Sequence, residues 1–170
     1  MSVSRNPTVC VCGDHCFAAV TKGLVVLVSP QDAHHLAHTW QASLGGRSAF
    51  ISRKIWTPAT KTRRTVVLAR EILKPSPGIW VDHISGDGTD NRRPNLRAAS
   101  PQENSFNRRP ERFKNVSSKG VCRKRNGRYQ AQIMRGGHRQ FLGSFGSEAE
   151  AALAYERAAQ SLHGEFARIR

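Results

Sequence analysis

The hydrophobic pattern changes across a short charged segment, residues 110–118, and this change restricts the folds open to the chain. Before the segment, short apolar runs are separated by turn residues. After it, polar and apolar residues alternate, and a long helical repeat follows. Only 38% of the 170 residues are apolar, which is low for one compact core. We therefore predict an α+β protein made of small folded units joined by polar segments.

The positive charge of the chain indicates a polyanionic partner. The chain has 27 Lys and Arg residues against 12 Asp and Glu, so its formal net charge is +15. The excess lies in segments that are patterned as folded protein, not in a tail. Because a phosphate neutralised by Lys or Arg releases a condensed counterion, nucleic acid is the first candidate. A membrane surface or an acidic protein ranks below it.

The lengths of the apolar runs and the number of cysteines limit the cellular compartment expected for the chain. The longest apolar run, residues 24–28, is far shorter than the roughly 20 residues of a membrane helix, and no signal-peptide core is present. Four cysteines are too few and too unevenly placed for a disulfide framework. We expect a cytoplasmic protein with no membrane partner and no small-molecule substrate, and we favour a monomer.

A group of soft metal-binding side chains lies near the N-terminus: Cys10, Cys12, His15 and Cys16. Structural zinc sites usually pair C-x2-C knuckles, whereas these cysteines have the spacing C-x-C-x3-C and no second pair. We therefore weigh small residues near an N-terminus above a zinc site at these four positions.

The first part of the chain is predicted to form a small α+β unit. A β-rich run over residues 23–28 predicts a buried strand, and the opening dozen residues are expected to be loose. Ser29 and Pro30 predict the start of a short helix, with Ser29 as N-cap and Asp32 in the first turn. Two further strands are expected over residues 48–55 and 65–68.

Residues 81–109 are dense in side chains that bind metals or transfer protons. We predict a strand over residues 81–84, a tight turn at 86–88 and a helix that begins near Ser100. A strand, loop, strand and helix in this order can bring an acid on the strand and an amide on the helix to one point. Such oxygen ligands suit a hard divalent cation.

Spaced residues in this segment resemble the HNH motif of phage and intron homing endonucleases, a ββα-metal fold. The residues that carry the resemblance are Asp82-His83, Gly86, Asp90-Asn91-Arg92, Asn95-Leu96-Arg97 and Gln102-Glu103-Asn104. One position departs from the family: Ala69 precedes Arg70 where a His is frequent, and we expect packing or DNA contact to change more than chemistry. The resemblance implies a metal-dependent DNA endonuclease in a bacterial or phage-infected cell.

The resemblance also implies roles for individual residues. Asp82 and Asn104 would bind one divalent metal, Mg²⁺ or alternatively Mn²⁺, and His83 would be the general base. Asn95 would hold the loop and orient His83. The side chains expected to contact phosphates are Arg92, Arg93 and Arg97. The alternative is that the aspartates of this segment are only turn residues and that Asn95 and Asn104 are only caps. Turn chemistry explains residues 86–91, but it does not explain Asp82-His83 on a strand followed by both asparagines.

The last part of the chain predicts three antiparallel strands and a helix. The strands are expected over residues 120–124, 128–134 and 139–143, and a helix capped by Ser147 and Glu150 over 147–162. One sheet face would pack on the helix through Tyr129, Ala131 and Ile133. The other face carries Arg and Gln, which can read guanine and adenine in the major groove.

Residues 117–169 resemble the AP2 DNA-binding domain, through Lys119-Gly-Val, Phe141-Leu-Gly and residues 150–159. The exposed-face pattern and this resemblance together give the expected DNA-facing side chains, which are Lys119, Lys124, Arg128, Gln130, Gln132, Arg139 and Phe141. Cys122, Asn126 and Met134 stand where the plant members carry Arg, Trp and Arg, so the plant sequence preference is not expected. The alternative is a basic sheet face that is merely solvated.

The predicted organisation has four segments: an α+β lead-in (1–64), an HNH core (65–110), a linker (111–118) and an AP2-like domain (119–170). We predict an endonuclease of phage or mobile-element type that cuts or nicks double-stranded DNA. The alternative is a non-catalytic, sequence-specific DNA-binding regulator with an inactive HNH fold. An RNA-binding protein ranks third, because no RNA-type stacking motif is present.

Overall fold

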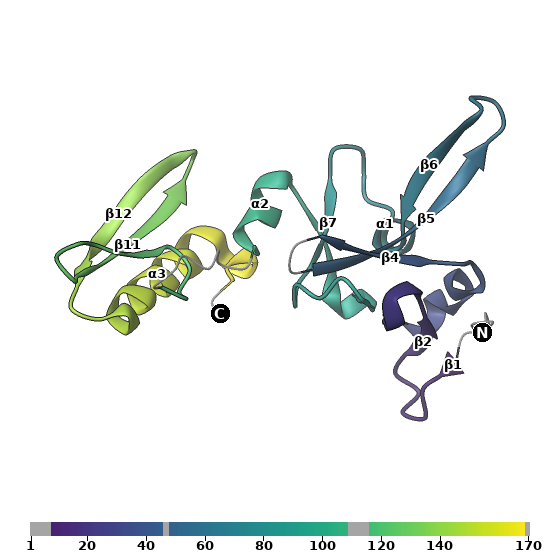
Figure 1. Ribbon diagram of the computed structural model, residues 1–170, viewed down its shortest axis with the longest axis horizontal. Coiled ribbons are helices and arrows are strands. Elements are labelled where there is room, and N and C mark those ends of the chain that lie inside the picture. The colour runs from purple at the N-terminus through teal and green to yellow at the C-terminus, as the bar shows by residue number, and fades with distance from the viewer. Residues whose placement is uncertain (1–7, 46–47, 109–115, 169–170) are drawn as a thin grey trace. The chain divides into compact units, whose positions relative to one another are not determined.

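The structure, a computed structural model, describes residues 8–45, 48–108 and 116–168. The chain divides into two compact units, Met1–Pro101 and Gln102–Arg170, and Figure 1 labels many of their elements. This division precedes the predicted linker, and residues 111–115 of that linker lie outside the described residues. Each unit combines small sheets with helices, which confirms the predicted α+β class.

The first unit contains three small sheets. Its elements are β1 (Thr8–Val9), β2 (Cys16–Ala19), η1 (Thr21–Gly23), β3 (Val25–Val28), η2 (Pro30–Ala37), β4 (Gln41–Gly45), β5 (Ser48–Thr57), β6 (Thr62–Val67), α1 (Leu68–Leu73), β7 (Trp80–His83), β8 (Asp90–Asn91), η3 (Arg93–Asn95) and β9 (Leu96–Ala99). The sheets have the orders β1-β2-β3-β8, β4-β5-β6 and β7-β9. All pairings are antiparallel except that of β8 with β3. A further helix, α2 (Pro101–Phe106), crosses the division between the units.

One hydrophobic core joins these sheets. Val26 and Val28 on β3 are completely buried, because alternate residues of a strand face the same side. They belong to one cluster with Leu36, Ile51 and Leu68, each of which is at most 2% exposed. Full burial of a side chain of this size stabilises a fold by about 1.5–3 kcal/mol. The core therefore connects the first sheet to β5 and to α1, the helix that precedes β7.

The helix predicted at Ser29 is the 3-10 helix η2, and Ser29 does not cap it. The Ser29 hydroxyl instead accepts a hydrogen bond of 2.9 Å from the backbone N–H of Arg93. Asp32 is buried and accepts two bonds of 2.8 and 2.9 Å from the Arg93 guanidinium, 61 positions away. Ser29 stands at the predicted N-cap position, but its hydroxyl makes no cap bond, because a distant partner binds the hydroxyl that local rules assign to the cap.

Strand boundaries in the first unit differ from the prediction at three places. β1 and β2 form a short hairpin that begins within the opening dozen residues, which were expected to be loose. β5 ends at Thr57 and β6 begins at Thr62, so the hairpin that they form is longer than expected. This hairpin projects from the unit in Figure 1. The predicted strand over residues 65–68 ends at Val67, because Leu68 begins α1 and is buried in the core.

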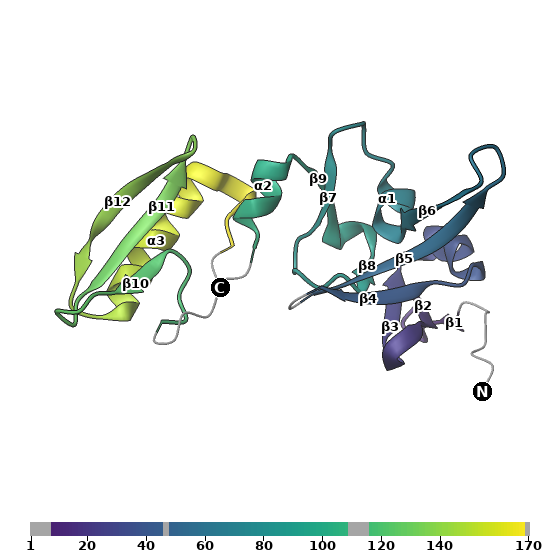
Figure 2. The same cartoon turned by 45° about the horizontal axis from the view of Figure 1, so that its top comes forward.

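The second unit is a three-stranded antiparallel sheet packed on one helix, as predicted (Figure 2). Its elements are β10 (Val121–Arg123), β11 (Tyr129–Arg135), β12 (His138–Phe145), α3 (Glu148–His163) and η4 (Gly164–Phe166). Ala151, Tyr155 and Ala159 are buried at a spacing of four residues along α3, and they meet Ala131 and Ile133 of β11. None of the described helices has the length and apolarity needed to cross a membrane.

Local turn and cap chemistry in this unit follows the sequence closely. Gly136 and Gly137 have φ of 55° and 84° and join Arg135 to its partner on β12, as a two-residue hairpin requires. The Ser147 hydroxyl accepts a bond of 3.2 Å from the Glu150 amide, which confirms it as the N-cap of α3. The Glu150 carboxylate bonds the amide of Gly146 at 3.1 Å, one residue before the position that a capping box predicts.

The end of the predicted linker packs as part of the second unit. Val116 is 8% exposed and lies in the core with Ala131 and Ala151. The amides and hydroxyls of Ser117 and Ser118 donate four hydrogen bonds of 2.7–3.1 Å to one carboxylate oxygen at the start of α3, that of Glu148. These bonds, led by the Ser118 hydroxyl, lower the pKa of Glu148. Residues 116–118 are therefore held to the unit by specific contacts.

Candidate functional site

The β7-β9 hairpin positions the residues of the predicted HNH segment. Asp82 pairs with Arg97 and His83 pairs with Leu96 across the two strands. The Ile84 amide donates to the Asn95 carbonyl at 2.9 Å, and the Gly86 amide donates to the His83 carbonyl at 2.8 Å. Gly86 has a φ of 71°, a conformation that favours glycine. These backbone bonds start the loop directly after His83, as the predicted tight turn requires.

Asn95 ties the two ends of this loop together. Its side-chain oxygen Oδ1 accepts a hydrogen bond of 2.9 Å from the Ser85 backbone amide, and its side-chain nitrogen Nδ2 donates to the Asp90 backbone carbonyl at 2.7 Å. Asn95 is 9% exposed, so both bonds are shielded from water. The role of holding the loop, implied by the HNH resemblance, agrees with these contacts.

The His83 ring contacts the side chain of Asn91, to which we had assigned no role. Asn91 is 1% exposed, and its Oδ1 lies 3.3 Å from His83 Nε2. The Asn91 amide nitrogen donates to the Gly88 carbonyl at 3.1 Å, which fixes which end of the side chain faces the ring. Because Oδ1 can only accept, His83 Nε2 carries the hydrogen and Nδ1 carries the lone pair. Asn91 thus contacts the ring that Asn95 is expected to orient, and orientation of His83 by Asn95 stays a prediction.

Burial also favours the neutral form of His83. Desolvation lowers its pKa, and the hydrogen bond to Asn91 acts in the opposite direction with less effect. A buried imidazole in its neutral form has a lone pair that can accept a proton. The ring therefore has the protonation state that a general base needs.

Asp82 lies beside His83 on β7 and forms a buried ion pair across the hairpin. Arg97 donates to Asp82 Oδ2 from Nε at 2.8 Å and from Nη2 at 2.7 Å. The two side chains are 6% and 11% exposed. A two-pronged pair of this kind fixes both groups in place, and the guanidinium compensates the buried charge of Asp82.

Each of the three arginines predicted to contact phosphate is held by a carboxylate. Arg92 binds Asp90 with bonds of 2.8 and 2.7 Å, and this contact lowers the pKa of Asp90. Arg93 binds Asp32, and Arg97 binds Asp82. The sequence prediction missed Asp32 and Asp82 as partners, because they lie 61 and 15 positions from their arginines, and it missed Asp90 although Arg92 is only two positions away. The guanidinium groups thus support the fold, and phosphate contact by these arginines stays a prediction.

The second predicted metal ligand, Asn104, lies on α2 within the second unit, whereas Asp82 belongs to the first. Each unit is described by itself, so a metal held jointly by Asp82 and Asn104 also stays a prediction. The predicted start of the helix is confirmed, because α2 begins at Pro101.

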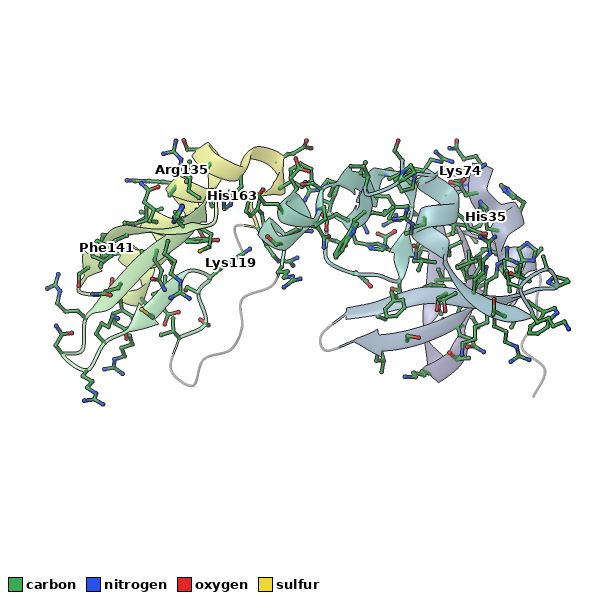
Figure 3. The ribbon with its side chains drawn as sticks, turned by 90° about the horizontal axis from the view of Figure 1, so that it is seen from above. His35, Lys74, Lys119, Arg135, Phe141 and His163 are labelled. Carbon is green, nitrogen blue, oxygen red and sulfur yellow. The ribbon has the colours of Figure 1, made fainter. Side chains whose placement is uncertain are left out.

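The exposed face of the second sheet carries most of the side chains predicted to meet DNA. Gln132 pairs with Phe141, and Met134 pairs with Arg139, so these four share one face. Phe141 is 61% exposed, and Figure 3 labels it on β12. Gln130 pairs with Ser144 and alternates with the buried Ala131. Ala131 and Ile133 face α3, so the predicted division into two faces agrees with the pairing.

Two other predicted DNA-facing residues lie at the turn of the first hairpin. Lys124 is exposed, and its backbone amide donates to the Arg128 carbonyl at 2.9 Å. The Arg128 guanidinium is bonded within the sheet, to the Ser144 hydroxyl at 3.1 Å and the Ser144 carbonyl at 2.7 Å. Lys124 is therefore an exposed cation, whereas the Arg128 guanidinium is hydrogen-bonded to Ser144 of β12.

Lys119 differs most from its predicted role on the DNA-facing surface. Its ammonium group donates to the Phe106 carbonyl, and Phe106 stacks on His163 with ring centroids 3.6 Å apart. Figure 3 labels Lys119 and His163. Burial, with smaller effects from Arg168 and Arg108, lowers the pKa of Lys119 to about 8. Lys119 thus anchors the end of α2 within the second unit. The sequence held no signal for this contact, because Phe106 precedes the segment that resembles AP2.

The four candidate zinc ligands separate into two groups. Ligand atoms of Cys10, Cys12 and His15 all lie within 4.8 Å of one another, whereas Cys16 is 2% exposed and packs in the core. The structure thus gathers three soft ligands that we had expected to be only small residues near an N-terminus.

Comparisons with known proteins agree with both resemblances. Over 89 residues the chain is 37% identical to a protein of Acanthamoeba polyphaga mimivirus that is named an uncharacterized HNH endonuclease. Over 53 residues it is 45% identical to dehydration-responsive element-binding protein 2C of Arabidopsis thaliana. The first similarity covers 52% of this chain and 46% of the viral protein, and the second covers 30% of this chain and 16% of the plant protein. No family profile and no solved structure matches.

The chain spans less than half the length of either relative. The viral relative supports a nuclease of HNH type, and the plant relative supports a DNA-binding module. The comparisons therefore show that this chain is similar to a viral protein named an HNH endonuclease and to an element-binding protein of a plant.

Proposed function

We propose that this chain is a metal-dependent DNA endonuclease of HNH type, and that its second unit holds double-stranded DNA. The observation that carries the proposal is the half-buried His83 ring, which lies beside the buried Asp82 and contacts Asn91 so that Nδ1 carries the lone pair. The similarity to an HNH endonuclease supports the same assignment. Homing and a phage or mobile-element origin belong to this proposal as its finer details.

His83 acts as the general base in the proposed reaction. Its Nδ1 takes a proton from the attacking water, which adds to the phosphorus of the scissile phosphodiester. Asn91 and Asn95 keep the ring and the loop in place while this happens. Asp82, a buried carboxylate with hard oxygen donors, and Asn104 would hold Mg²⁺ or Mn²⁺. The bound cation would supply positive charge to stabilise the phosphate and the leaving 3′ oxygen as the bond between phosphorus and that oxygen breaks.

The second unit binds the DNA in this proposal. Its exposed sheet face presents Gln132, Arg139 and Phe141 together, a set that combines hydrogen-bond donors with an apolar surface. A catalytic unit with little base discrimination gains a target when it is linked to a DNA reader, because the effective concentration of DNA rises.

The test is cleavage of supercoiled plasmid by the purified chain with Mg²⁺, with Mn²⁺ and with excess chelator. We expect nicked or linear plasmid with either metal and intact plasmid with chelator. Salt-sensitive duplex binding without cleavage under any metal would favour the alternative, a DNA-binding regulator with an inactive HNH fold. Stronger competition by RNA than by duplex DNA would favour an RNA-binding protein.

Replacing Gln132 and Arg139 by Ala should weaken duplex binding without changing the dependence of cleavage on metal. Each bidentate contact to a base contributes about 1–3 kcal/mol, so each variant should lose roughly fivefold to a hundredfold in affinity for the preferred site. Fluorescence anisotropy with labelled duplex at fixed salt measures this loss. Arg157→Ala is the control, because Arg157 is an exposed residue of α3. If Gln132→Ala and Arg139→Ala each bound the duplex as tightly as the unaltered chain and Arg157→Ala, the proposed DNA-binding face would be contradicted.

A further inference from the structure

The β1-β2 hairpin at the start of the described chain is closed by a compact loop. Val9 pairs with Cys16, and inside that pair the Cys10 amide donates to the His15 carbonyl at 2.9 Å. The Gly13 amide donates back to the Cys10 carbonyl at 2.9 Å, and Gly13 has a φ of 77°. The backbone therefore folds Cys10, Cys12 and His15 onto one side of a six-residue loop.

The side chains of this loop have the spacing of ligands around one metal ion. Cys12 Sγ lies 3.5 Å from His15 Nδ1, and the Cys10 sulfur lies within 4.8 Å of both ligand atoms. A tetrahedral zinc ion, with Zn–S of about 2.3 Å and Zn–N of about 2.0 Å, keeps its ligand atoms roughly 3.5–3.8 Å apart. A small inward movement of Cys10 would therefore complete three of the four positions.

Cys16 explains why sequence spacing alone argued against a metal here. Its side chain is buried in the first core, on the other side of the strand from the ligand cluster. The relevant spacing is therefore Cys10-x-Cys12-x2-His15, and the third cysteine of the C-x-C-x3-C pattern belongs to the core. The four residues that looked like an incomplete knuckle thus divide into three ligands and one core residue.

The outer strand and the loop of the hairpin have little apolar burial, whereas β2 pairs with β3 and buries Cys16 in the core. β1 has two residues, and its Val9 is 62% exposed, while Val11 in the loop is fully exposed. Small elements without apolar burial are commonly stabilised by a metal or a disulfide. The hairpin is the edge of the β1-β2-β3-β8 sheet, whose β8 carries Asn91, the residue that contacts His83.

We propose that the β1-β2 loop binds one zinc ion through the Cys10 and Cys12 thiolates and the His15 imidazole, with water in the fourth position. Zinc displaces the two thiol protons, so the charges of the ion and the two thiolates cancel. Because the unfolded loop holds no preformed site, binding stabilises the folded hairpin. Metal binding at this loop does not depend on the proposed nuclease activity.

Cobalt titration of the reduced, chelator-stripped full chain tests this proposal, because thiolate ligation gives a ligand-to-metal absorption band. We expect one such site per chain, and Zn²⁺ should displace the bound Co²⁺. Cys12→Ser should lower the affinity by more than about a hundredfold, since loss of even an outer contact costs 10–100-fold. Cys12 is exposed, so this variant should fold normally, which circular dichroism verifies.

Two controls make the result specific. Cys122→Ser removes the cysteine of the second unit, and His83→Ala removes the histidine of the proposed nuclease site; both should keep the thiolate band. Absence of the band at saturating Co²⁺ would overturn the proposal. So would a band that survives in both Cys10→Ser and Cys12→Ser. Since the band reports sulfur ligation, failure of plasmid cleavage would leave this result unchanged.

Discussion

His83→Ala should abolish metal-dependent cleavage of duplex DNA and leave DNA binding unchanged. General-base catalysis contributes about 10²–10⁴-fold to a rate, so the variant should fall by that factor. The half-buried ring contacts the buried Asn91 and lies outside the main hydrophobic cluster, so its removal should not unfold the unit. Plasmid nicking under single-turnover conditions measures the rate, and fluorescence anisotropy measures binding.

His38→Ala is the matched control, because His38 is an exposed histidine of the same unit. It should cleave at the unaltered rate. Added imidazole should restore part of the activity of His83→Ala, because the small base can enter the space left by the ring. Cleavage by His83→Ala at the unaltered rate would reject His83 as the base and leave the rest of the proposal without its central residue.

Arg97→Met should destabilise the first unit by about 3 kcal/mol or more. The substitution leaves the Asp82 carboxylate buried without the two hydrogen bonds that it accepts from the guanidinium. Removing one partner of a buried ion pair typically costs about 3–5 kcal/mol. Urea unfolding monitored by tryptophan fluorescence measures this free energy, because Trp40, Trp56 and Trp80 all belong to the first unit.

Two variants separate this structural role from a simple loss of positive charge. Arg63→Met removes an exposed cation of the same unit and should change the free energy of unfolding by less than about 0.5 kcal/mol. Combining Arg97→Met with Asp82→Asn removes the buried charge and should recover part of the loss. Unaltered stability with weaker DNA binding in Arg97→Met would show instead that Arg97 serves phosphate contact, as the sequence had suggested.

Features that depend on neighbouring residues were predictable from the sequence. The turn after His83, the Gly136-Gly137 hairpin and the Ser147 cap each depend on groups within about four positions, where residue type and spacing nearly determine the geometry. The two faces of β11 followed from strict alternation, because one face meets α3. The α+β class followed from the same local patterns.

Partner choice for polar groups was decided by the tertiary structure. Arg93 lies 61 positions from Asp32, and Lys119 lies 13 positions from the Phe106 carbonyl that it binds. A guanidinium that looks available for phosphate in the sequence thus binds a buried carboxylate in the fold, because an unpaired buried charge is costly. The sequence determined most strands, the glycine turns and the Ser147 cap, whereas packing determined that Arg93 meets Asp32, that Arg97 meets Asp82 and that Asn91 contacts His83.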